Sequence, residues 1–192
     1  MKKNSAIVIG AGLAGCEAAW QLARFGVDVT LVEQKPLVFS PAHSQETFAE
    51  LVCSNSLRAE GLANAVGLLK QEMRELGSLI MRAADETKVP AGGALAVDRK
   101  ALSEYITNAV RSNGHIEVVT EQAKEIPDEG VVIVAAGPLA SRPLVDDIAR
   151  RTNGMFSFYD AAAPIVTAES VDMGKAFWAS RYGEGSDYLN CP

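Results

Sequence analysis

A glycine turn near the start of the chain has the composition of a phosphate-binding loop. It consists of Gly10, Ala11, Gly12, Leu13, Ala14 and Gly15, a match to GxGxxG. A short apolar run over 5–9 precedes it, and the residues from Cys16 to Phe25 are expected to form a helix after it. In such a unit the first glycine permits a tight turn, the second lets the backbone approach a diphosphate, and the third lets helix and strand pack closely. Free N–H groups at the helix start then bind the phosphates.

An acidic residue stands where a ribose-binding carboxylate is expected. Glu33 ends a second apolar segment, predicted as a strand over 27–33. Its separation from the turn is near the roughly 20 residues typical of dinucleotide-binding units. A carboxylate there would accept hydrogen bonds from ribose hydroxyl groups. The turn and Glu33 together predict a dinucleotide site, but they do not distinguish FAD from NAD.

Cys53 is the candidate nucleophile among the three cysteines. It lies in a run of mixed polar and apolar residues from Glu50 to Ser56, in a segment without clear periodicity. Reactive thiols need partial exposure and a stabilised thiolate, which a polar loop permits. From the spacing alone, a small buried cysteine is the commoner alternative. Cys16, in the expected first helix, is predicted to pack, and nothing around Cys191 indicates a role.

The two histidines are weaker candidates. His43 lies in the same expected loop as Cys53, where it could act as an acid, a base or a phosphate contact. His115 precedes an expected strand and is predicted to lie on the surface. Lone histidines are more often structural than catalytic, so only His43 is kept as a candidate.

The composition excludes several classes of protein. The 192 residues include 18 Lys and Arg against 24 Asp and Glu, a formal charge of −6 that would repel a polyanion, so charge alone predicts no nucleic-acid binding by this stretch. No apolar run approaches the ~20 residues of a membrane helix, and no signal peptide is evident. Three widely spaced cysteines predict neither a disulfide framework nor a metal site, and a reducing cytoplasm fits them best.

The elements that must position these residues alternate between strand and helix. Residues 34–56 are expected to be mostly loop, and 60–87 one long amphipathic helix or two with a break near Gly77-Ser78. A further helix around 102–110, strands at 116–119 and 131–135, and a short helix ending at Arg151 follow. The pattern predicts an α/β fold with a Rossmann-like, doubly wound parallel sheet. We expect 1–89 to form the first part of the dinucleotide-binding domain, 90–170 an inserted smaller lobe with return strands, and 171–192 an incomplete continuation.

Several longer runs point together to one family. They are GAGLAGCEAA (10–19), PAHSQETFAELVCSNSLR (41–58), NAVGLLKQEM (64–73), VPAGGALAVDR (89–99), VAAGPLAS (134–141) and YDAAAPIV (159–166). Across essentially the whole chain they resemble the folate- and FAD-dependent tRNA uracil-5-methyltransferases of bacteria. The resemblance departs at Gln34-Lys35-Pro36, where members of that family usually show Met-Arg-Pro.

The resemblance implies a reaction and roles for particular residues. Members of that family transfer a methyl group from 5,10-methylenetetrahydrofolate to C5 of the T-loop uridine of tRNA, with FAD as reductant and NAD(P)H recharging the flavin. Addition of a thiolate at C6 makes C5 nucleophilic, and the loop cysteine of the family falls on Cys53. Gly10, Gly12, Gly15 and Glu33 carry over as FAD contacts. Family chains are more than twice as long, so this chain is expected to correspond to an N-terminal portion.

Four other functions stay open at this point. A related FAD- and folate-using family modifies the wobble uridine of tRNA, and another folate-dependent enzyme acts on ribosomal RNA. The SNSLR run after Cys53 argues against the wobble-uridine family. Nothing in the sequence distinguishes the enzyme that acts on ribosomal RNA from the one that acts on tRNA. A flavin-binding module without catalytic activity is a third possibility. An NAD-dependent dehydrogenase is the least favoured, because no hydride-transfer constellation is evident.

Overall fold

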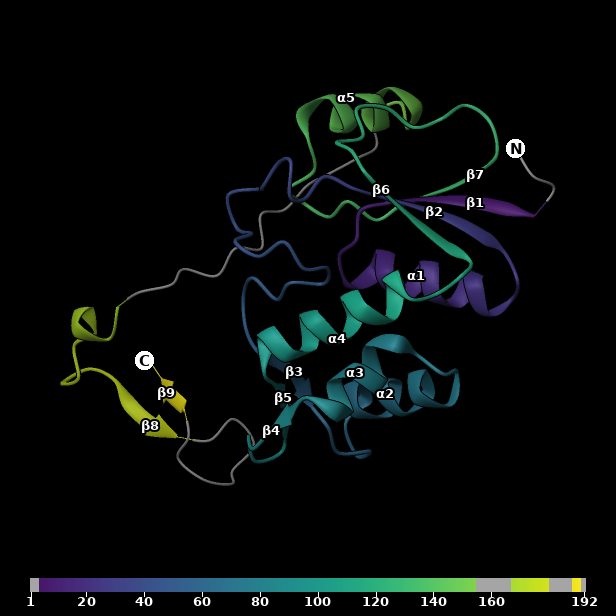
Figure 1. Cartoon of the computed structure of the whole chain (residues 1–192). Helices are drawn as coiled ribbons and strands as arrows, with labels where there is room; N and C mark the ends of the chain where they lie inside the picture. Colours follow the sequence, from purple (N-terminus) through teal and green to yellow (C-terminus); the bar gives the residue numbers. More distant parts are fainter. Residues whose placement is uncertain (1–3, 155–166, 180–187, 191–192) are drawn as a thin grey trace.

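The computed structural model describes residues 4–154, 167–179 and 188–190 (Figure 1). A four-stranded parallel sheet forms the centre of the fold. The strands are β1 (Ser5–Ile9), β2 (Asp28–Glu33), β6 (Ile116–Thr120) and β7 (Val131–Val134), in the order β6-β2-β1-β7. β1 pairs with β2 from Ser5↔Asp28 and with β7 from Ala6↔Val131. Because β1 is flanked on both sides, the glycine turn that follows it lies in the middle of the sheet's carboxyl edge, where ligands of such sheets bind.

Helices cover both faces of this sheet. Figure 1 shows α1 (Leu13–Arg24) and α4 (Arg99–Arg111) on one face and α5 (Arg142–Arg151) on the other. Val8 and Leu31 are fully buried on the first face, together with Cys16 of α1 and Leu102 of α4. Alternation of buried and half-buried residues along β2 reflects its two unequal faces. The prediction of an α/β fold with a doubly wound parallel sheet is confirmed.

A second, antiparallel sheet lies beside the first layer of helices. Its strands are β3 (Ser56–Ala59), β5 (Ala94–Val97) and β4 (Lys88–Val89), in that order. Between β3 and β4 the chain forms α2 (Ala65–Glu75) and α3 (Leu79–Glu86). Gly77 has a φ of 71°, and the Ser78 hydroxyl caps α3 by accepting a hydrogen bond from the Met81 N–H. Of the two alternatives predicted for 60–87, one long helix or two with a break near Gly77-Ser78, the structure has the second.

Three local predictions were wrong. The first helix begins at Leu13 and not at Cys16, because Gly12 already serves as its N-cap. Residues 60–64 are not helical, and α2 begins only at Ala65. Residues 56–59, where the sequence predicted no strand, form β3 by pairing with β5.

The remainder of the described chain is short. A 3-10 turn, η1 (Ala168–Ser170), precedes β8 (Phe177–Ala179), which pairs antiparallel with β9 (Tyr188–Asn190). The expected division between residues 89 and 90 falls between β4 and β5, which are neighbours in one sheet. The run 159–166 and Cys191 lie outside the described residues. None of the helices within the described ranges is long and apolar enough to cross a bilayer.

Candidate functional site

A pocket of about 220 Å³ opens at the carboxyl edge of the parallel sheet. Its walls come from the glycine turn after β1, the end of β2, the loops after β6 and β7, and the loop over 40–52. Complete small-molecule sites usually measure about 300–1,000 Å³. The pocket is smaller than that and has room for only part of a dinucleotide, and its position matches the site predicted from the glycine turn.

Two glycines of the turn have no room for a side chain. Gly10 has a φ of 100°, and a Cβ there would lie 2.7 Å from the carbonyl oxygen of Ala135, just after β7. A Cβ on Gly15 would lie 1.8 Å from the carbonyl oxygen of Gly10. Both positions therefore hold the turn tightly between α1 and the sheet.

Gly12 differs from its two neighbours in the motif. A Cβ on Gly12 would meet nothing within 4 Å, and the residue lines the pocket. It is also the N-cap of α1, and its carbonyl oxygen accepts the first helical hydrogen bond from Cys16 N–H at 2.9 Å. The N–H groups of the first helical turn have no acceptor within the helix, and that turn carries no acidic side chain. An anion such as a diphosphate fits here, against an open backbone and a partially positive helix end.

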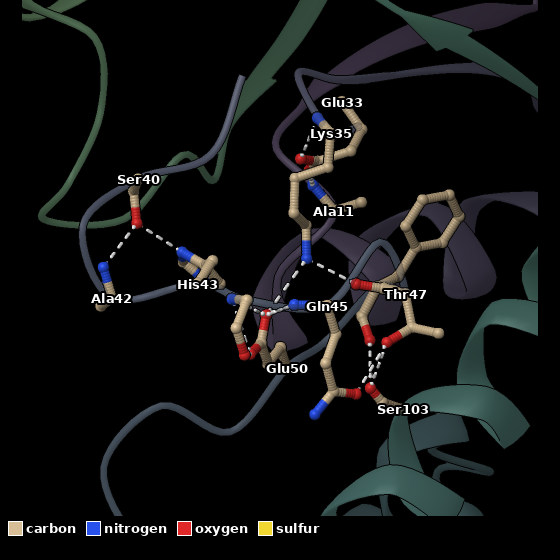
Figure 2. Close-up of polar contacts among 12 residues, drawn as sticks. Ala11, Glu33, Lys35, Ser40, Ala42, His43, Gln45, Thr47, Glu50 and Ser103 are labelled. Carbon is tan, nitrogen blue, oxygen red and sulfur yellow. Dashed lines mark hydrogen bonds and ion pairs between the residues drawn. The ribbon is translucent and has the colours of Figure 1, made fainter. Parts of the chain in front are cut away.

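Glu33 is buried beneath the turn, with 7% of its surface exposed. Its Oε2 accepts a hydrogen bond from the Ala11 N–H at 2.8 Å, and its Oε1 accepts one from the Lys35 N–H at 2.9 Å (Figure 2). The carboxylate thus braces the glycine turn against the segment after β2. Each carboxylate oxygen has a second lone pair, so it can still accept a hydrogen bond from a ribose hydroxyl. The residues present fit the adenosine diphosphate part of FAD.

The two described cysteines lie in opposite environments. Cys53 is exposed, and the preceding residue, Val52, lines the pocket, although Cys53 itself does not. Cys16 is fully buried, and its Sγ lies 3.4 Å from the Ala11 carbonyl oxygen. Burial, followed by the nearby Glu33 carboxylate, raises the pKa of Cys16 to about 12. The prediction that Cys16 packs is confirmed.

The two histidines also separate. His43 lines the pocket, and its Nδ1 lies 2.6 Å from the Ser40 hydroxyl oxygen. Burial, followed by the charge of Lys35, lowers the pKa of His43, which keeps the imidazole neutral at pH 7. His115 is half-exposed at the other edge of the sheet, with its Nδ1 3.0 Å from Asp28 Oδ1. The prediction that His115 lies on the surface is confirmed.

Sequence reasoning missed two charged residues beside the pocket, Lys35 and Glu50. Their side chains are each 6% exposed, and Lys35 Nζ lies 3.7 Å from Glu50 Oε2. Both residues line the pocket. Charged residues in an irregular segment are normally solvated, so nothing in the local sequence indicated their burial.

Comparison with known proteins gives the context of this pocket. The chain is 61% identical over 187 residues to the methylenetetrahydrofolate--tRNA-(uracil-5-)-methyltransferase TrmFO of Acetivibrio thermocellus, which covers 96% of this chain and 43% of that protein. It is 59% identical over 194 residues to the protein of the same name from Geotalea daltonii, covering 100% of this chain and 44% of the relative. The resemblance inferred from the sequence motifs is thereby confirmed. The chain spans less than half the length of these relatives.

A family assignment and a shared fold complete the comparison. The structure of Aquifex aeolicus GidA superimposes with a TM-score of 0.56 at 20% identity, over 70% of this chain and 25% of that one, which shows a common fold. The family model described as glucose inhibited division protein A matches residues 5–192. The chain therefore belongs to the glucose inhibited division protein A family.

Proposed function

We propose that this chain is part of a FAD- and folate-dependent tRNA (uracil-5-)-methyltransferase. The reaction is transfer of the one-carbon unit of 5,10-methylenetetrahydrofolate to C5 of the T-loop uridine, which gives ribothymidine. High identity to relatives that carry this methyltransferase name supports the assignment. The structural observation that supports its dinucleotide site is the open backbone at Gly12, set at a helix start above the buried Glu33.

The FAD site follows from that geometry. The N–H groups of Leu13, Ala14 and Gly15, at the start of α1, face no helical acceptor and bind the diphosphate, while Gly12 gives it room to approach. Glu33 accepts hydrogen bonds from the ribose. Gly10 and Ala11 shape the turn, because Gly10 packs against β7 and Ala11 donates to Glu33. When bound and reduced, FAD would supply the hydride, two electrons with one proton, that converts a methylene into a methyl group, and NAD(P)H would reduce the flavin again.

Cys53 is the nucleophile in this proposal. Its thiolate adds to C6 of the target uridine, and the electron pair of the C5–C6 double bond moves onto the C4 carbonyl as an enolate. C5 then attacks the electrophilic methylene carried by the folate. Loss of the C5 proton expels tetrahydrofolate and leaves an exocyclic methylene group on C5. This group accepts the hydride as a methyl group, and the thiolate leaves C6, which restores the C5–C6 double bond. An exposed thiol beside the mouth of the pocket can meet a base presented by a macromolecule.

Flavin binding is the first test. Purified chain is examined for a flavin absorbance spectrum, and the apo form is titrated with FAD, alongside Gly12→Glu, which places a negative side chain in the open space at the diphosphate position. We expect saturable binding that Gly12→Glu abolishes. Failure of the wild-type chain to bind FAD at high concentration contradicts the assignment for this chain, and titration of a longer chain then tests whether further residues are needed to close the site.

Covalent trapping tests the role of Cys53. T-loop RNA containing 5-fluorouridine cannot lose a proton from C5, so it should hold the enzyme as an adduct when every cosubstrate is present. We expect an adduct with the wild type and none with Cys53→Ala. Equal adduct yields would remove Cys53 from the mechanism. Mapping of the methylated position separates the T-loop from the wobble position and from ribosomal RNA, and flavin binding without any methyl transfer indicates a non-catalytic module.

A further inference from the structure

A buried ion pair joins the two ends of the segment between β2 and the Cys53 loop. Lys35 lies two residues after the end of β2 and Glu50 three residues before Cys53, yet their charged groups approach within 3.7 Å (Figure 2). Removing two charges from water costs several kcal/mol per ion unless further hydrogen bonds complete their surroundings. The surroundings of each partner therefore indicate what the pair holds in place.

On the Lys35 side, contacts run without interruption to the glycine turn. The Lys35 N–H donates to Glu33 Oε1, and Glu33 Oε2 accepts from the Ala11 N–H. The Lys35 ammonium also donates to the carbonyl oxygen of Thr47, in the middle of the loop. Lys35 is thus fixed at its backbone by the ribose-binding carboxylate and at its side chain by the loop.

On the Glu50 side, the carboxylate is held by the loop itself. It accepts hydrogen bonds from the Ser44 N–H at 3.0 Å, the Ser44 hydroxyl at 3.0 Å and the Gln45 N–H at 3.1 Å. Burial raises the pKa of Glu50, but the hydrogen bonds from Ser44 and Gln45 and the charge of Lys35 outweigh it and leave the pKa below its usual range. Glu50 is therefore ionised and anchored at neutral pH.

Cys53 lies on a short span between two anchors. One anchor is Glu50, and the other is Asn55, whose carbonyl oxygen accepts from the Val97 N–H at 3.0 Å and whose side chain donates to the Val97 carbonyl oxygen at 3.3 Å. An extended chain covers at most about 3.6 Å per residue, so the Cα of Cys53 stays within about 11 Å of that of Glu50. Displacing Glu50 moves the segment that carries the thiol, including Val52 in the pocket wall.

We propose that Lys35 and Glu50 are positioning residues that couple the ribose-binding end of the dinucleotide site to Cys53. A dinucleotide that contacts Glu33 stiffens the contacts from Glu33 through Lys35 to Glu50 and thereby restricts the segment that presents the thiol. This inference rests on the proposed function, because it requires a dinucleotide at Glu33 and a reactive Cys53. Coupling of this kind acts in both directions, so the state of Cys53 also affects the affinity for the dinucleotide.

The test measures how FAD changes the reactivity of Cys53. The rate of alkylation of Cys53 by iodoacetamide is followed by mass spectrometry of its peptide, with and without saturating FAD, in the folded 192-residue chain. The variants are Lys35→Met, which removes the charge, Glu50→Gln, which keeps the shape, and Lys35→Arg, which keeps the charge. Lys100→Met is the matched control, because Lys100 and Glu104 form a pair at the same 3.7 Å separation but with both side chains exposed. Melting curves and FAD titrations verify that each variant is folded and saturated.

We expect FAD to slow alkylation of the wild type by about fivefold or more, the lower end of usual coupling between sites. The quantity compared is the ratio of the alkylation rate without FAD to the rate with FAD. Lys35→Arg and Lys100→Met should keep the wild-type ratio. Lys35→Met and Glu50→Gln should still bind FAD, but their ratio should fall to within about twofold of one. An unchanged ratio in both Lys35→Met and Glu50→Gln, or no effect of FAD on the wild type, overturns the coupling and leaves the FAD assignment standing. Absence of FAD binding by the wild type overturns the proposed function and the coupling with it.

Discussion

The three glycines of the turn should respond to alanine in different ways, and Gly15 and Gly12 give the sharpest contrast. The Cβ of Gly15→Ala would lie 1.8 Å from the Gly10 carbonyl oxygen, where real Cβ atoms essentially never come closer than 3.0 Å. The helix and the turn must therefore separate by about 1 Å or more, and overpacking of this kind costs about 1–3 kcal/mol or more. For a domain of this size that lowers the melting temperature by about 2–12 °C.

Gly12→Ala should instead leave folding intact and weaken FAD binding. Gly12 has a φ of −73°, which alanine adopts freely, and its Cβ meets no protein atom within 4 Å. Loss of a preferred N-cap residue destabilises the folded chain by about 0.5–1 kcal/mol, and the lower entropy of the unfolded chain stabilises it by about the same amount. The two effects nearly cancel in the free energy of unfolding. The methyl group occupies the space of the diphosphate, and a penalty of about 1.4 kcal/mol already raises the Kd for FAD tenfold.

Thermal melting followed by circular dichroism and FAD titration by flavin fluorescence measure the two effects separately. The reasoning predicts a lowered melting temperature for Gly15→Ala, and for Gly12→Ala a wild-type melting temperature with a raised Kd. A Gly12→Ala chain that binds FAD as tightly as the wild type would refute the placement of the diphosphate. A Gly15→Ala chain that melts with the wild type would refute the packing of the turn.

Three further outcomes are expected. At pH 8, iodoacetamide should label Cys53 and leave Cys16 unmodified in the folded chain, because a pKa of about 12 leaves only about one Cys16 thiol in ten thousand as thiolate. Mass spectrometry of the two peptides measures the labelling, and equal labelling of both cysteines would contradict the burial of Cys16. Ser103→Ala should destabilise the chain by about 1–3 kcal/mol in urea denaturation, because the buried Ser103 hydroxyl donates to the Phe48 carbonyl oxygen at 3.1 Å, whereas the exposed Ser112→Ala should not. The hydrogen bond from the Ile126 N–H, together with Arg151 and Arg150, lowers the pKa of Asp147. The stability that the Asp147 carboxylate contributes is therefore present above the usual aspartate pKa and is lost as the pH falls through the lowered value. Asp147→Asn should be less stable than the wild type at pH 6, and the difference should shrink toward pH 3.

The parts of the fold that sequence predicted well are those with local signals. The apolar strands, the glycine turn and the helix break at Gly77-Ser78 each depend on residues within a few positions of one another. β3 and β5 were missed because neither alternates: all four residues of β5 are buried, and β3 exists only by pairing with β5 across the intervening helices. Their formation depends on tertiary contacts that short windows do not contain.

In the candidate site, too, the residues with a local sequence signal were predicted and the contacts that depend on distant parts of the chain were not. Glu33 was predicted from its position at the end of a strand, and its burial under the turn agrees with that position. Its hydrogen bonds to Ala11 and Lys35 were not foreseen, nor was the buried pair of Lys35 and Glu50. The irregular segment between them acquires its shape from hydrogen bonds to distant elements, such as the Phe48 N–H to the Thr107 hydroxyl of α4. Sequence periodicity carries no information about such a segment.

The central position of β1 has a consequence for the order in which the protein matures. β1, the glycine turn, α1 and β2 leave the ribosome before β7, and among the described strands β1 has only one neighbour until Val131–Val134 have been synthesised. Gly10 likewise lacks its packing partner until Ala135 and Ala136 emerge. A parallel pairing between segments so far apart in the chain closes slowly. The glycine turn is therefore completed only after β7 has been synthesised, so a dinucleotide that binds there would be acquired after the sheet has closed and would not template the first βαβ unit.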